Sequence, residues 1–467
     1  MTDFLSSNSF GLYLSSGVAF IVAIGLLVAV HEYGHFAVGR ALGFKVLRFS
    51  IGFGKPLWMR VGRDGTEYVL ARIPLGGYVK FADEREAPVD AAVQAQAFNR
   101  RPVWARIAVL VAGPGANFVF ALAAFWVLYQ IGVPGLRPLV GDVVLESVGA
   151  RAGLRQGDEI VAVGGHPVAT QETVVLGLLD AVSGAGPVTL TVRGQGGTRD
   201  LVLDVPAAER RALTEPGAWS QGLGFGFAQP KRPVVVGKLV AGGSAEAAGL
   251  QVNDRIVSVD GVPVADFGAF VDLIRHRPGT TATFGVERAG ARLELAVEVR
   301  AETDPARPSA PPVGRIGIGP GGEPQWPPGM LTEQRYGPVA ALGAALRETW
   351  EKTAFTAKLL SRMVAGQVSA KNISGPLSIA TYAGITARAG GTPFLGFLAL
   401  ISISLGVLNL VPIPILDGGQ VVYQCAEAIR GRPLSERVQA LGQQLGVAML
   451  IVLMALAFYN DIARQLG

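Results

Sequence analysis

The sequence predicts a polytopic α-helical membrane protein with four transmembrane helices, a membrane-associated β-hairpin or sheet, and two small domains outside the cytoplasm. Three observations support this class: a composition poor in charge, four long apolar segments, and an internal repeat. Half of the 467 residues are hydrophobic and 16% are charged, whereas globular chains carry roughly 25% charged residues. The net charge of +5 comes without a basic stripe interleaved with aromatics, so no nucleic-acid partner is expected.

Four apolar segments are long enough to cross a bilayer, which takes about 20 predominantly apolar residues. We expect the four helices within residues 1–41, 101–135, 390–420 and 438–460. No basic residue precedes the first apolar run, so a cleaved secretory signal is not expected there. The connection from Arg40 to Arg106 carries 12 Lys and Arg against 6 Asp and Glu. This excess predicts that the connection is cytoplasmic and that both termini lie on the opposite side.

His31-Glu32-Tyr33-Gly34-His35 lies at the end of the first apolar segment. Because helix residues i and i+4 share one face, His31 and His35 can bind one metal ion while Glu32 acts as a base. Ionisable side chains at membrane depth are costly and usually mark function. A soluble-type helix that carries surface His and Glu is the alternative.

The stretch Asn409-Leu410-Val411-Pro412-Ile413-Pro414-Ile415-Leu416-Asp417-Gly418-Gly419 offers a third ligand. Its two prolines break the third apolar helix, and such a break is tolerated at membrane depth where the backbone is buried or lines a cavity. Asp417 is then expected at the cytoplasmic end of the third span, at the depth of the two histidines. Since a catalytic zinc usually takes three protein ligands, we expect a two-His, one-carboxylate site.

Residues 42–100 are expected to form a cytoplasmic or membrane re-entrant β region. The stretch from Phe44 to Phe81 alternates like strands and has glycines at turns. A peptide bond in a helical substrate is shielded by helix hydrogen bonds until the segment unwinds. We therefore expect a hairpin that dips toward the membrane and holds the unwound substrate along its free edge as an added strand. An ordinary cytoplasmic hairpin is the alternative.

Residues 140–168 recur as residues 236–264, at a constant offset of 96 positions. Each copy predicts a short helix that ends at a glycine, a turn with Asp, and an alternating strand. The pattern resembles bacterial PDZ domains, which we place at residues 136–206 and 228–302. Such domains generally bind extended peptide ends by strand addition, and a role as spacers or steric filters is the alternative.

Two further segments follow the second repeat. Residues 303–336 are expected to form a Pro- and Gly-rich linker, and its proline-rich part, residues 305–328, is expected to lack regular structure. Residues 337–366 show apolar positions at helical spacing with charges between them. They predict an amphipathic helix that lies on the outer membrane interface or, alternatively, packs against a repeat domain.

Together these motifs resemble the site-2 proteases, a family of intramembrane zinc metalloproteases, and most closely their bacterial regulator-of-sigma-E protease type. The resemblance covers essentially the whole chain and includes further signatures at residues 72–80, 113–118 and 372–376. It implies one Zn2+ per chain, the ligands His31, His35 and Asp417, and Glu32 as the catalytic glutamate. Candidate substrate contacts are Asn409, Asn117, Gly76, Gly77 and Tyr78. Interhelical hydrogen bonding is the alternative for both asparagines, and for Asn117 we weigh it equally.

The resemblance also implies a physiological role. It is regulated cleavage within the transmembrane segment of a single-span protein, such as an anti-sigma factor already cut by a site-1 protease, or a remnant signal peptide. The expected location is the bacterial inner membrane, with termini and PDZ domains in the periplasm and the active site near the cytoplasm. A PDZ scaffold with a vestigial metal site and a transporter are the competing classes, and the intact metal motif and lack of an inverted repeat disfavour them.

Overall fold

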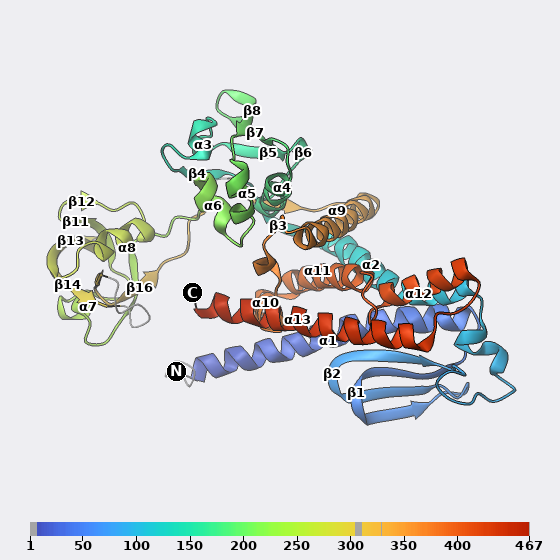
Figure 1. Cartoon of the computed structure of the whole chain (residues 1–467). Helices are drawn as coiled ribbons and strands as arrows, with labels where there is room; N and C mark the ends of the chain where they lie inside the picture. Colours follow the sequence, from blue (N-terminus) through green and yellow to red (C-terminus); the bar gives the residue numbers. More distant parts are fainter. Residues whose placement is uncertain (1–6, 304–310, 328, 467) are drawn as a thin grey trace.

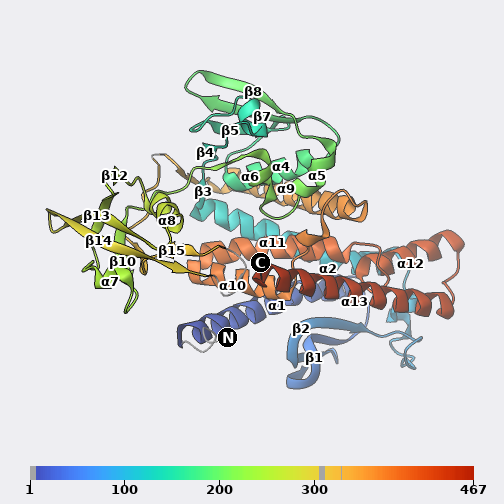
Figure 2. The ribbon, with the colours of Figure 1, turned by 60° about the vertical axis from the view of Figure 1, so that its left-hand side comes forward.

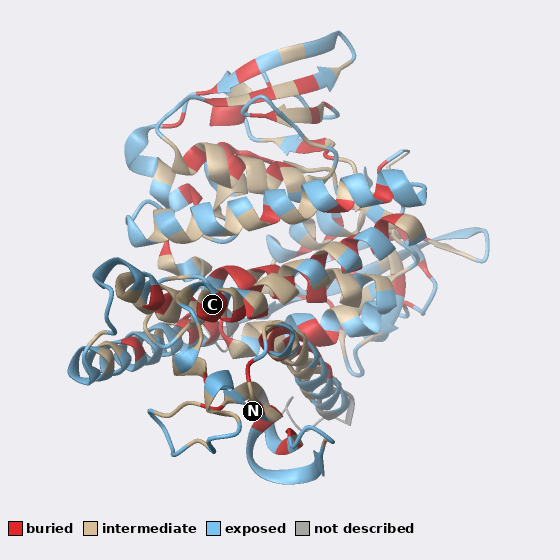
Figure 3. Cartoon of the chain, turned by 90° about the vertical axis from the view of Figure 1, so that its right-hand side faces the viewer, coloured by how far each residue is buried: buried red, intermediate tan, exposed pale blue. Residues whose placement is uncertain are grey.

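The computed structural model describes residues 7–303, 311–327 and 329–466 (Figure 1). Four of its helices are long and apolar enough to cross a membrane, as expected. They lie in α1 (Ser7–Ala41), α2 (Val103–Ile131), α11 (Gly391–Asn409) and α13 (Glu436–Leu466). Helix α2 packs against both α1 and α11. Figure 3 shows buried residues where the helices meet and exposed residues along their outer faces, the pattern of helices that face lipid.

The third span is shorter than the expected region 390–420. Helix α11 ends at Asn409, and Asp417 begins a separate helix, α12 (Asp417–Arg430). The expected break at the two prolines is confirmed, but Asp417 does not belong to the third spanning helix. Its position therefore depends on how α12 is held by its neighbours.

The β region consists of two long, bent strands, β1 (Val46–Val61) and β2 (Glu67–Phe81). Residues 46–51 of β1 pair with residues 77–81 on one side and with residues 67–70 on the other. Residues 67–70 pair in turn with residues 58–61. Residues 77–81 thus form one edge of the folded sheet. The sheet lies on the opposite side of the helices from the first repeat (Figures 1 and 2).

The two repeats fold as similar units. The first contains β4 (Val140–Val143), α3 (Val148–Arg151), β5 (Glu159–Val163), β6 (His166–Pro167), α4 (Gln171–Ser183), β7 (Val188–Gly194) and β8 (Gly197–Leu203). The second contains β10 (Val235–Leu239), α7 (Ser244–Ala247), β11 (Arg255–Val259), β12 (Val262–Pro263), α8 (Phe267–Arg275), β13 (Thr280–Arg288) and β14 (Ala291–Glu302). Each unit has its own core of buried apolar side chains.

Both repeats extend beyond the boundaries expected from the sequence. Strand β9 (Phe225–Phe227) pairs with β4, and β16 (Ile318–Gly321) pairs with β10. Each unit is therefore closed by a strand that follows it in the chain. We define the first repeat domain as residues 139–228, and the second as residues 234–303 and 311–321.

The segment expected to be an irregular linker contains regular structure. Besides β16, it forms β15 (Val313–Arg315), which pairs with β14, and β17 (Leu331–Gln334), which pairs with β3 (Val133–Leu136). Among the prolines of this segment that the structure describes, Pro320 lies in a paired stretch, on an edge strand where a missing N–H is tolerated. The prediction of no regular structure for residues 305–328 was wrong for β15 and β16.

The amphipathic helix is α9 (Pro338–Val364). It packs against α2 and α11 on one side and against α4 of the first repeat domain on another. Of the two expected placements, contact with a repeat domain is therefore present. Helix α10 (Pro376–Ala389), which the sequence analysis did not identify, follows it and contacts α1, α11 and α13.

Candidate metal centre

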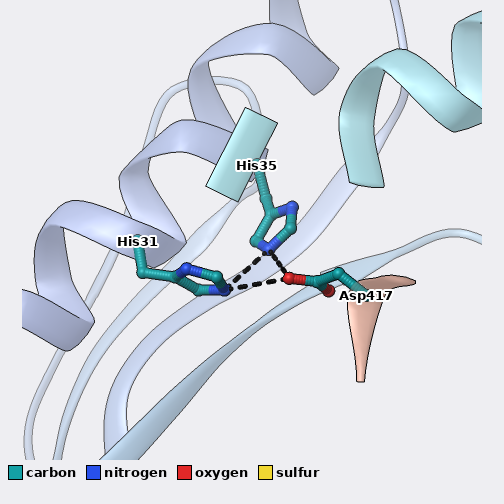
Figure 4. A group of neighbouring side chains, drawn as sticks. All are labelled: His31, His35 and Asp417. Atoms are coloured by element: carbon teal, nitrogen blue, oxygen red, sulfur yellow. Dashed lines mark hydrogen bonds and ion pairs between the residues drawn. The ribbon is translucent and has the colours of Figure 1, made fainter. Parts of the chain in front are cut away.

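Three predicted ligands converge at the end of α1 (Figure 4). His31 Nε2 and His35 Nε2 lie 3.2 Å apart. Asp417 Oδ2 lies 3.2 Å from His31 Nε2 and 3.5 Å from His35 Nε2. The carboxylate comes from the first turn of α12, so two elements separated by more than 380 positions supply one site.

The spacing of these three atoms fits a zinc ion. Tetrahedral ligands bound at 2.0–2.1 Å lie about 3.3 Å from one another, close to the separations between the two imidazoles and the carboxylate. Two neutral imidazoles and a carboxylate are also a ligand set that zinc accepts. These residues form a group of His and acidic side chains, within the described chain, whose ligand atoms could hold a metal ion.

The other ring nitrogen of each histidine has its own partner. His35 Nδ1 donates to the Val109 carbonyl at 2.8 Å. His31 Nδ1 lies 3.1 Å from the side-chain amide of Asn117. A proton on Nδ1 leaves Nε2 free to bind a metal. The Asn117 atom that faces the ring is the amide nitrogen, so a proton on His31 Nδ1 requires the amide to turn over. Its oxygen, which is otherwise buried without a partner, would then accept that proton.

Close packing of α2 against α1 depends on a glycine. A Cβ on Gly113 would lie 2.2 Å from His35 Nε2 and 2.9 Å from His31 Cε1. Any larger residue at this position would displace both imidazoles. The glycine in the predicted signature at residues 113–118 thus makes room for the metal ligands.

A cavity of about 570 Å³ opens beside the site. Its walls include the three ligands, Glu32, and residues 77–81 of β2. Glu32 is only 8% exposed, and its Cγ would be 2.9 Å from a Cβ on Gly77. The edge of the sheet therefore runs directly past the candidate base, and the glycine allows this approach.

The candidate substrate contacts are placed differently from one another. Gly77 and Tyr78 line the cavity. Gly76 has positive φ and lies under the ring of Phe53, while Asn409 ends α11. Among the described residues that line the cavity, neither Gly76 nor Asn409 occurs. Asn117 is fully buried against His31, which favours the hydrogen-bonding alternative over substrate contact.

Sequence reasoning missed two side chains near the site. Gln420 lines the cavity, one turn after Asp417. Arg106, in the first turn of α2, forms an ion pair with Glu427 of α12. A buried charge at the start of an apolar helix is a signal that could have identified Arg106, but its partner depends on the tertiary structure.

Comparisons with known proteins match nearly the whole chain. Residues 19–453 match peptidase family M50. The chain is 42% identical to "Regulator of sigma-E protease RseP" of Escherichia coli K12, over 96% of this chain and 98% of that protein. It is 41% identical to a "Putative zinc metalloprotease" of Vibrio cholerae and 39% identical to "Protease RseP" of Yersinia pestis, each over at least 96% of both chains.

Proposed function

Because this chain belongs to peptidase family M50 and is an intramembrane zinc metalloprotease, we propose that it hydrolyses peptide bonds within the transmembrane segments of single-span membrane proteins. One observation carries the proposal: a His, His and Asp ligand set with a neighbouring glutamate lies at the end of an apolar helix, in a cavity bordered by a free strand edge.

Each polar residue at the site has a distinct task. His31, His35 and Asp417 would hold one zinc ion, which when bound polarises the scissile carbonyl and lowers the pKa of a water molecule toward about 7. Glu32 adjoins His31 and faces the same cavity. It accepts a proton from the attacking water and passes it to the leaving amide nitrogen. Val109 and Asn117 hold the imidazoles in the orientation that exposes Nε2.

The sheet edge at residues 77–81 holds the substrate in an extended conformation. Its backbone pairs with β1 on one side only, in the described part of the chain. A peptide added to the other side would form strand hydrogen bonds and would lie in the cavity beside Glu32. This geometry replaces the helix hydrogen bonds that the substrate loses when it unwinds.

The repeat domains act as PDZ domains that screen substrates outside the membrane. An apolar groove of about 290 Å³ supports this for the second repeat domain, because it lies between α8 and residues 314–318, which lead from β15 into the edge strand β16. Its lining includes Phe267 and Val271 together with Arg275 and Arg315. An extended peptide with an apolar end and a free carboxylate fits such a groove. Exclusion of bulky substrates is the alternative.

The cellular setting follows from the relatives and the charge pattern. We place the protein in a bacterial inner membrane, with the repeat domains in the periplasm and the zinc site near the cytoplasm. Relatives are named regulators of sigma-E. An anti-sigma factor trimmed by a first protease is therefore the expected substrate, and a remnant signal peptide is the second candidate.

Cleavage of a single-span substrate by the purified full-length chain tests the function. We expect cleavage that a chelator abolishes and zinc restores. Glu32→Gln should keep zinc but lower the rate by about 10²–10⁴-fold, the range of general base catalysis. The exposed Glu351 of α9 offers a matched control, Glu351→Gln, with an unchanged rate. Normal turnover by Glu32→Gln protein would refute the assignment.

A further inference from the structure

One face of α2 contacts the elements that carry all three metal ligands. Arg106, Val109, Gly113 and Asn117 follow one another at spacings of three, four and four residues, so they share one side of the helix. We call these four residues the α2 stripe. Asn117 contacts His31, Val109 accepts from His35, and Gly113 makes room for both rings.

Arg106 extends the stripe toward the third ligand. Its Nη1 donates to Glu427 Oε2 at 3.0 Å, and its Nη2 donates to Oε1 at 2.6 Å. This bidentate ion pair is largely buried, since the Arg106 side chain is 5% exposed and that of Glu427 is 18% exposed. Such bidentate geometry fixes the relative orientation of the two side chains as well as the distance between them. It joins the first turn of α2 to the fourth turn of α12.

The connection that leads to Asp417 is irregular, although Gln420 Nε2 donates to the Pro414 carbonyl within it at 2.8 Å. Seven residues, including Pro412 and Pro414, separate it from the end of α11. The Leu416 N-cap makes no side-chain hydrogen bond. Glu427 lies ten residues further along, about 15 Å up the helix. A carboxylate at one end of α12 and an anchor near the other define how the helix lies along α2.

We propose that Arg106 is a positioning residue for the metal ligand Asp417, acting through Glu427 and the rigid body of α12. The α2 stripe then orients both imidazoles and the carboxylate from a single helix. This inference rests on the zinc site of the proposed function. Stability alone does not account for the pair, because a buried ion pair is often no more stabilising than apolar residues of the same volume.

Metal binding by the purified full-length chain tests the role of Arg106. Zinc affinity is measured by competition with a chromogenic chelator, and ligand geometry by the visible absorption of the cobalt-substituted protein. We expect Arg106→Ala and Glu427→Ala each to weaken zinc binding by about 10- to 100-fold, the range for groups that orient metal ligands. Both variants should also change the cobalt spectrum.

Three further variants separate positioning from folding. Arg106→Lys keeps the charge but loses the bidentate contact with Glu427. It should show an intermediate loss of zinc affinity with unchanged helix content. The exchange Arg106→Glu with Glu427→Arg should recover most of the affinity. Lys352→Met removes a buried basic residue from α9, far from the zinc site, and should leave zinc affinity unchanged.

The outcomes distinguish this inference from the proposed function. If the parent chain binds no zinc, the proposed function fails. If it binds zinc while both alanine variants keep its affinity and cobalt spectrum, the positioning role of Arg106 is wrong. An exchange variant that folds but stays as weak as the single variants would also overturn it.

Discussion

The two repeat domains share a sequence signature but differ in how they are attached. In each, an Asp at the same repeat position is paired with an arginine: Asp158 with Arg199, and Asp254 with Arg288. Each arginine also donates to the carbonyl of a corresponding glycine. The arginines come from different strands, β8 and β13. In both domains the Asp of this turn is thus paired with an arginine, but the arginine comes from a different strand in each.

Within the described residues, ion pairs to the helical part hold the first repeat domain but not the second. Lys352 of α9 donates to Glu172 at 2.7 Å, while Lys358 and Arg362 pair with Asp180. The α5–α6 connection, from α5 (Ala207–Leu213) to α6 (Ala218–Leu223), packs against α4 and β9. In the second domain, α8 and residues 314–318, which lead into β16, border an open groove.

The second repeat domain lacks the groups that make this attachment. At the repeat offset, Glu172 corresponds to Gly268 and Asp180 to His276. Among the described residues, ion pairs of the second domain join only its own side chains. The shared signature therefore determines the fold of each domain, whereas residues outside it determine whether the domain is tied to the helical part by ion pairs.

Removal of Lys352 should have the largest effect on the difference in attachment between the two repeat domains. Lys352→Met leaves Glu348 without its buried partner. It should lower the free energy of unfolding by about 3 kcal/mol, the lower end of the range for breaking a buried ion pair. Amide hydrogen exchange should rise along α4 and α9 and stay unchanged in the second repeat domain. The exposed Arg292 pair of the second domain gives the control, since Arg292→Met should change nothing measurable.

Loss of the turn arginines should affect the domains unequally. Arg288→Ala removes a charged hydrogen-bonding partner from buried Asp254 and should lower the free energy of unfolding by about 2 kcal/mol. Arg199→Ala removes the same contacts in the first domain, which α9 supports. Exchange protection should therefore fall further in the second domain. Equal loss of protection in both domains would mean that attachment to α9 adds no stability.

The open groove should bind peptides only in the second repeat domain. Val271→Asp places a charge in the groove and should raise the Kd of a labelled peptide with an apolar C-terminus by about tenfold, or 1.4 kcal/mol. The corresponding substitution in the first domain, Val175→Asp, should leave the Kd unchanged. If the parent chain binds no such peptide, exclusion by size becomes the better account of the domains.

The smallest expected effect is a pH dependence at the turn of the second domain. Hydrogen bonding to Arg288 holds the pKa of Asp254 below its ordinary value of 3.8. A lowered pKa contributes stability above the ordinary value, and that stability is lost as the pH falls through the folded pKa. Exchange protection of β11 and β13 should therefore decline below about pH 4. Arg288→Ala should weaken this dependence.

Local sequence patterns were sufficient to predict the spanning helices and the chemistry of the site. Hydrophobic length is a property of a continuous segment, and His31, Glu32 and His35 share one helix face because of helix periodicity. Asp417 could be chosen as a ligand because few acidic residues follow a proline-broken apolar helix. Alternation also predicted strands between Phe44 and Phe81, but it did not show that residues 77–81 form the free edge, which follows from the strand pairing.

Contacts between distant segments could be read only from the tertiary structure. Strands β9 and β16 close the repeat domains from beyond the recognisable signature, because a short edge strand carries little pattern of its own. Arg106 and Glu427 are 321 positions apart, and Asn117 meets His31 from another helix. The sequence by itself identified the candidate zinc ligands and the candidate base. Only the tertiary structure decided how these side chains are oriented. Their orientation depends on contacts that α2 makes with α1 and α12.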